Sequence, residues 1–112
     1  MNIINQHQVE RLKQEIGADN LPILLDIFLS ELKQYAEKLS QPNGDQDVYL
    51  KEISHALKSS AASFGAEALC NLAIDYDGAA KSGLALTSPE CKQQMMDLLE
   101  QTHHQYEVLL RQ

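Results

Sequence analysis

The chain has 112 residues, a formal net charge of −7 and 44% hydrophobic residues. This length suits a single core, so we expect one domain over residues 1–112, and the apolar fraction excludes a disordered chain. The acidic balance argues against nucleic acid or an anionic membrane surface as a partner. The sequence shows no leader pattern and no apolar run of membrane-spanning length, so we expect a cytoplasmic protein with two reduced cysteines, Cys70 and Cys91.

Apolar residues recur with helical spacing along nearly the whole chain, and no window shows the alternation of a strand. In chain order, the sequence predicts helices over about 9–16, 21–39, 47–64 and 66–82 and a last helix that begins at 89, with a turn at 41–45. The connections are short. We therefore predict an all-α fold, an up-down antiparallel four-helix bundle with a short additional N-terminal helix.

Residues typical of helix boundaries stand at several of these points. Asp19 or Asn20 can cap the second helix, and Ser88 can cap the last one, in which Pro89 takes the first position. Gly78 lies inside the fourth helix, where glycine costs about 1 kcal/mol relative to alanine. Such a glycine indicates close packing or a loosened last turn.

The third helix contains the stretch "HALKSSAASFGA", which begins at His55. With about 100° of rotation per residue, the stripe centred on Ile53 is expected to be buried and to hold Leu50, Leu57, Ser60, Ala61 and Phe64. His55 falls at about 200° from the centre of that stripe. We therefore expect its imidazole to face solvent.

The exposed face around His55 carries few long side chains. Lys58 and Ser59 lie one turn after it, Ala62 lies two turns after it and Lys51 lies one turn before it. Lys51, Ser59 and Ala62 are the candidate docking residues, because a flat surface lets a partner approach the imidazole. An exposed imidazole can accept a phosphoryl group, and Lys58 could offset the added charge. An isolated surface histidine is most often an ordinary one, and small residues equally suit helix packing; periodicity does not separate these readings.

The segment "HALKSSAASFGAEAL" resembles the signature of the histidine-containing phosphotransfer (HPt) family, His-x-Leu-Lys-Gly-(Ser/Ala)-x-x-x-x-Gly-Ala-x-x-Leu. The matching residues are His55, Leu57, Lys58, Ser60, Gly65, Ala66 and Leu69. The resemblance implies that His55 carries the phosphoryl group and that Lys58 orients and neutralises it. It also implies that Gly65 permits the turn and close packing between the third and fourth helices. Ser59 replaces the usual glycine, which leaves docking possible and puts partner selectivity in question.

A longer match, "YLKEISHALKSSAASFGA" together with "LLDIFLSEL", is similar to the phosphorelay proteins of Vibrio quorum sensing. That similarity implies two partners, the receiver domain of a hybrid sensor kinase upstream and a LuxO-type response regulator downstream. No glycine-rich phosphate loop is present, so we expect a phosphocarrier without its own nucleotide site or cofactor, with Mg²⁺ on the partner receiver domain. The alternative is a helical-bundle adaptor that docks receiver domains without carrying phosphate.

The remaining candidates are weaker. His103 and His104 are adjacent on a helix and do not form an i, i+4 metal pair, so no metal site is expected. The segment "DYD", from Asp75 to Asp77, is interpreted as an acidic surface edge, since neighbouring residues do not share a helix face. No spare apolar stripe requires a second copy of the chain, so we expect a monomer.

Overall fold

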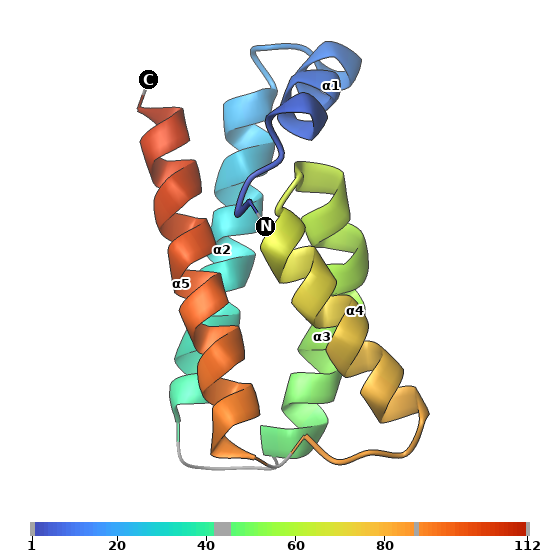
Figure 1. Cartoon of the computed structure of the whole chain (residues 1–112). Helices are drawn as coiled ribbons and strands as arrows, with labels where there is room; N and C mark the ends of the chain where they lie inside the picture. The colour runs from blue at the N-terminus through green and yellow to red at the C-terminus, as the bar shows by residue number, and fades with distance from the viewer. Residues whose placement is uncertain (1, 42–45, 87, 112) are drawn as a thin grey trace.

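A computed structural model describes residues 2–41, 46–86 and 88–111. Within these residues the chain is helical and has no strand, with elements α1 (Gln6–Ile16), α2 (Leu21–Ser40), α3 (Gln46–Phe64), α4 (Glu67–Lys81) and α5 (Pro89–Leu110). The four longer helices run lengthwise, and α1 lies across one end of them (Figure 1). The predicted fold class is confirmed; the predicted turn at 41–45 lies mostly outside the described residues. No helix in the described part of the chain offers an apolar stretch that could cross a bilayer.

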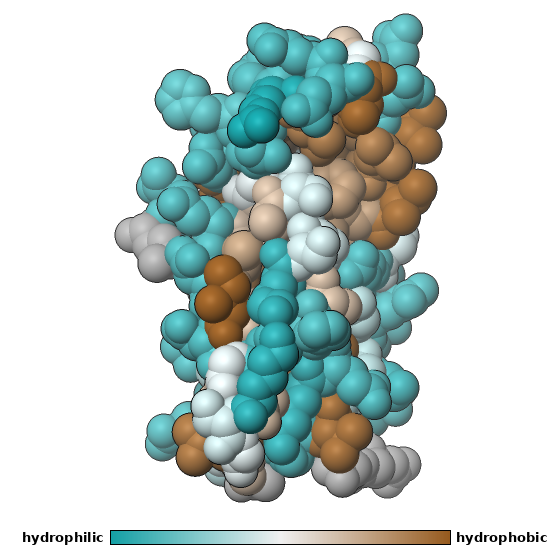
Figure 2. Space-filling view, turned by 90° about the vertical axis from the view of Figure 1, so that its right-hand side faces the viewer, coloured by the Kyte–Doolittle hydropathy of each residue, from teal (hydrophilic) through white to brown (hydrophobic). Residues whose placement is uncertain are grey.

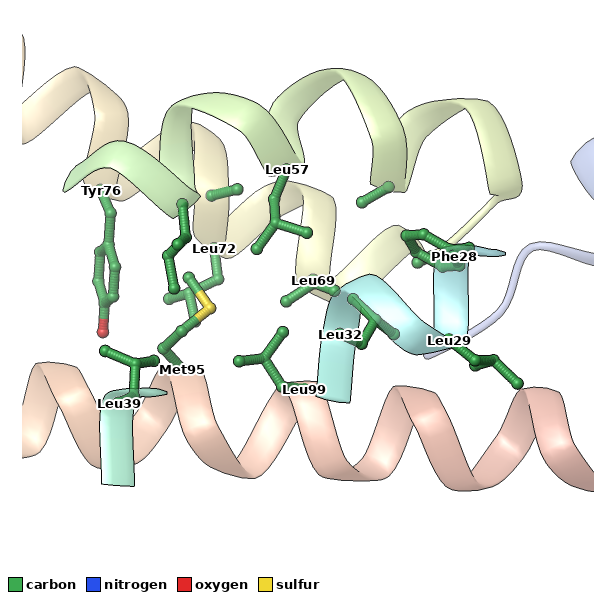
Figure 3. Close-up of a cluster of buried hydrophobic side chains, with 14 of the residues drawn as sticks. Phe28, Leu29, Leu32, Leu39, Leu57, Leu69, Leu72, Tyr76, Met95 and Leu99 are labelled. Carbon is green, nitrogen blue, oxygen red and sulfur yellow. The ribbon is translucent and has the colours of Figure 1, made fainter. Parts of the chain in front are cut away.

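The core is mostly aliphatic and lies between two helix pairs, α3 with α4 and α2 with α5, which make the most extensive contacts. Leucines of α2, α3 and α4 point towards Met95 and Leu99 of α5 (Figure 3). Aromatic rings complete one end of the core: Phe28 stacks on Phe64 with ring centroids 4.5 Å apart. The hydroxyl of the fully buried Tyr106 donates to the Phe64 carbonyl at 2.6 Å and so ties α5 to the end of α3.

The buried stripe of α3 is turned slightly from its predicted direction. Leu50, Ile53, Leu57 and Ala61 are buried as predicted, but Ser54 is also fully buried. Ser60 and Phe64 are only half-buried. The reason is that α3 packs chiefly against α4, so the side of α3 that faces α4 is buried as well. The apolar pattern of α3 alone does not show where α4 lies.

Gly65 stops α3 with a φ of +80°, a backbone conformation that favours glycine. A Cβ added there would lie 2.9 Å from the Asn5 carbonyl oxygen and 3.1 Å from the Gln8 Cβ. The Asn5 amide donates to the Gly65 carbonyl at 2.7 Å. The turn was predicted, but the close approach joins α3 to the start of α1 rather than to α4.

Two other boundary expectations change. The Asn20 side chain does not cap α2; its amide donates to the Ile16 carbonyl at 2.8 Å and closes the end of α1 instead. Gly78 has no atom within 4 Å of an added Cβ, so close packing inside the chain is not its reason. The Ser88 cap is confirmed, since its hydroxyl accepts from the Glu90 amide at 3.2 Å.

Candidate functional site

His55 lies on the outer face of α3, as predicted, and 68% of its side chain is exposed. Its Nδ1 is 3.1 Å from Oδ1 of Asp77 on α4. The two helices form an antiparallel pair joined at Gly65 and Ala66 (Figure 1), and His55 and Asp77 stand at nearly the same distance from this turn along the chain. The turn therefore sets the register that brings an exposed imidazole beside a carboxylate.

Asp77 is the structural centre of the site, and its interpretation as part of an acidic surface edge is wrong. Only 7% of its side chain is exposed, whereas its neighbour Asp75 faces solvent. Oδ2 of Asp77 is 2.6 Å from Nζ of Lys58 and 2.9 Å from Nζ of Lys81. Three donors on two helices thus converge on one carboxylate.

The electrostatics of this cluster keep Asp77 ionised. The ammonium groups of Lys58 and Lys81 hold the pKa of the Asp77 carboxyl far below its usual range, and His55 contributes in the same direction. Asp77 in turn raises the pKa of Lys81. An ionised carboxylate only accepts hydrogen bonds, so Nδ1 of His55 must be the donor. In the neutral ring the lone pair is then on Nε2, in a side chain that is mostly exposed.

The surface beyond His55 carries the small residues that the sequence placed there. Ser59 and Ala62 are exposed. Figure 2 looks onto this side and shows small side chains of intermediate hydropathy next to an apolar patch, with hydrophilic side chains below. Ile23 and Ile27 of α2 are among the large apolar residues that are most exposed, at 60% and 61%. Lys51 is less available, because its Nζ pairs with Oδ2 of Asp47 at 3.1 Å.

The other candidates do not join the site. His103 lies on α5, where its Nδ1 is 3.2 Å from Oε1 of Glu107. Cys70 and Cys91 are free and half-buried, and burial raises the pKa of the Cys70 thiol. Among the described residues, no group of three or more His, Cys, Asp or Glu side chains is arranged to hold a metal ion.

Sequence reasoning missed Asp77 and Lys81. One local signal was available, because an aspartate followed four residues later by a lysine is a favourable pair on a helix. The contact between Asp77 and His55 was not visible locally. It depends on the register of α3 against α4, which the turn at Gly65 fixes.

Comparison with known proteins identifies the family of the chain. The family model described as "Hpt domain" matches residues 23–105. The chain belongs to the Hpt domain family. It is 52% identical to phosphorelay protein LuxU of Vibrio vulnificus over 95% of this chain and 93% of the relative. It is 51% identical to LuxU of Vibrio cholerae over 96% of each chain, and 48% identical to LuxU of Vibrio harveyi over 94% of this chain and 93% of the relative.

A comparison with the solved structures gave no match. The family and the relatives show that the chain is a histidine phosphotransfer protein of a quorum-sensing phosphorelay, a phosphocarrier rather than an enzyme of the usual kind. The HPt domain model spans α3 and α4 entirely, so His55 and its buried partner both lie inside the matched region.

Proposed function

We propose that His55 is the phosphoryl carrier, accepting the group from an aspartyl phosphate of one receiver domain and donating it to an aspartate of another. The observation that carries this proposal is an exposed imidazole whose Nδ1 is occupied by a buried carboxylate. The Nε2 lone pair attacks phosphorus and forms the N–P bond. The P–O bond to the donor aspartate breaks, and its electron pair stays on that carboxylate. Donation is the reverse reaction on a second receiver domain.

Lys58 is proposed to neutralise and orient the transferred group. Its ammonium is already held next to the imidazole through Asp77, and 30% of its side chain is exposed. A small rotation of a lysine side chain brings the ammonium towards phosphoryl oxygens, where a charge-assisted hydrogen bond is strong. The site itself needs no further base, since phosphoryl transfer depends mainly on positioning and charge neutralisation.

The proposed docking face is the flat surface of α3 around Ser59 and Ala62, both exposed. Lys51 has only a minor part in it, because it is paired with Asp47. Ser59, where the family signature has glycine, adds a hydroxymethyl group at this face and is proposed to tune partner choice. The proposed partners are the receiver domain of a hybrid sensor kinase and a LuxO-type response regulator.

The same proposal covers the remaining properties of the carrier. Residues 1–112 act as one monomeric domain in the cytoplasm, without a nucleotide site of their own. The Mg²⁺ that phosphoryl transfer requires is supplied by the receiver domain. Support comes from the sequence, which has no glycine-rich phosphate loop and whose net charge of −7 disfavours association with a second copy of the chain.

Incubation with a ³²P-labelled receiver domain tests the proposal. We expect acid-labile, base-stable label on the native protein and on His104→Gln, a control at another exposed histidine, and none on His55→Gln. ATP alone should give no label. Binding of the receiver domain without any label on the native protein would replace the carrier with an adaptor that only docks receiver domains.

A further inference from the structure

The outer face of α4 carries one large exposed apolar side chain, Ile74. The structure describes all of α4, and the other large apolar side chains of this helix are buried, whereas 49% of Ile74 is exposed. Building on the proposed role of His55, we infer that this face of α4 is part of the surface that binds the receiver domain, with Ile74 as its apolar anchor. The interface thus spans α3 and α4 rather than α3 alone.

Contacts between α4 and α3 place Ile74 at the edge of the site. Ile74 lies one turn after Cys70 and one turn before Asp77. The Cys70 Sγ is 3.6 Å from the Lys58 carbonyl oxygen, and Oδ1 of Asp77 is 3.1 Å from Nδ1 of His55. Residues three or four apart are neighbours on a helix surface, so Ile74 lies on the same side of α4 as these two contacts.

The size of a protein interface requires that a second helix is covered. Phosphoryl transfer brings the receiver aspartate to Nε2 of His55, so the interface is centred there. A standard interface buries about 800 Å² on each partner, which is a disc of about 16 Å radius, whereas a helix with its side chains is only about 10–12 Å wide. Because α3 packs most extensively against α4, a disc of this size over His55 extends onto α4.

The surface around Ile74 leaves room for a partner. Ala62 of α3 and Cys70 and Asn71 of α4 line a hollow of about 200 Å³, one turn before Ile74. One turn after Ile74, Gly78 has no side chain, and no atom lies within 4 Å of an added Cβ. Figure 2 looks onto this side of the molecule and shows apolar side chains exposed among hydrophilic ones. A receiver domain can therefore close around Ile74 and remove its exposed half from water.

Isothermal titration calorimetry with the receiver domain of a hybrid sensor kinase tests the anchor. We expect Ile74→Gln, which keeps an uncharged side chain of similar size, to raise Kd about five- to tenfold, because the burial of half an isoleucine side chain is lost. Ile74→Leu should bind like the native protein. Val108→Gln is the matched control, since Val108 is 42% exposed on α5, at the other side of the bundle in Figure 1. Equal Kd values for Ile74→Gln and Val108→Gln would overturn the inference.

Phosphoramidate, a small phosphoryl donor that needs no docking surface, separates docking from chemistry. We expect native protein, Ile74→Gln and Val108→Gln to take the same label on His55 from phosphoramidate, and Ile74→Gln alone to be slower with a labelled receiver domain at concentrations below Kd. Loss of the phosphoramidate label in Ile74→Gln would overturn the inference, because Ile74 would then act on the site itself. A dimer of the native protein in sedimentation that Ile74→Gln abolishes would overturn it too, by assigning the face to a second copy. A native protein that takes no label from either donor contradicts the proposed function instead.

Discussion

Replacing Gly65 with alanine is expected to loosen the end of the bundle where α1 meets α3. The residue has a φ of +80°, and its new Cβ would lie 2.9 Å from the Asn5 carbonyl oxygen, a backbone atom that moves only with the chain. The positive φ alone costs about 1–2 kcal/mol for an L-residue. Displacing Asn5 also weakens the 2.7 Å bond from its amide to the Gly65 carbonyl, worth about 1 kcal/mol. We therefore predict a loss of about 2–3 kcal/mol in the free energy of unfolding.

Equilibrium urea unfolding followed by circular dichroism measures this loss. Gly83→Ala is the matched control, because its φ is +82° but no atom lies within 4 Å of the added Cβ. It should lose only the conformational part, about 1–2 kcal/mol. If the two variants lose the same stability, the contact with Asn5 contributes nothing and the steric reasoning is refuted.

Three further outcomes follow from the site and from α4. Lys58→Ala should slow phosphoryl acceptance about tenfold in a rapid-quench assay while the label stays on His55; an unchanged rate would remove Lys58 from the mechanism. Gly78→Ala should raise the free energy of unfolding by up to about 1 kcal/mol, because α4 continues through an exposed position with space for a Cβ; a loss on urea unfolding would reveal a constraint absent from the structure. Lys58, Lys81 and His55 lower the pKa of the Asp77 carboxyl below 3.8. Ionised Asp77 should therefore stabilise the fold fully above about pH 4, and this stabilisation should be lost as the pH falls through the folded-state pKa. The free energy of unfolding of the native protein and of Asp77→Asn is compared as the pH is lowered. A difference between them that persists to the lowest pH would contradict this prediction.

The helices and the exposure of His55 could be predicted because both depend on local information. Apolar spacing along one helix gives its period, and an angle of about 200° from the buried stripe places His55 outside. The Ser88 cap is equally local, since its hydroxyl bonds to the amide two residues later.

The rest of the site depends on how one helix lies against another. Asp77 was assigned to the surface because only its own neighbours on α4 were considered, whereas its burial comes from His55 and Lys58 on α3. Ser54 was missed for the same reason, since α3 turns towards α4 and buries a polar residue beside its apolar stripe. Lys51 was named as a docking candidate from its position alone, and its pairing with Asp47 one turn earlier was not foreseen.

The most direct test of the central claim follows one phosphoryl group between two receiver domains. A ³²P-labelled receiver domain of a hybrid sensor kinase is mixed with a LuxO-type receiver domain, with native protein, with His55→Gln or with neither. The account predicts rapid appearance of label on the second receiver domain only with native protein, and transient acid-labile label on His55 itself. Transfer at the native rate through His55→Gln would contradict it.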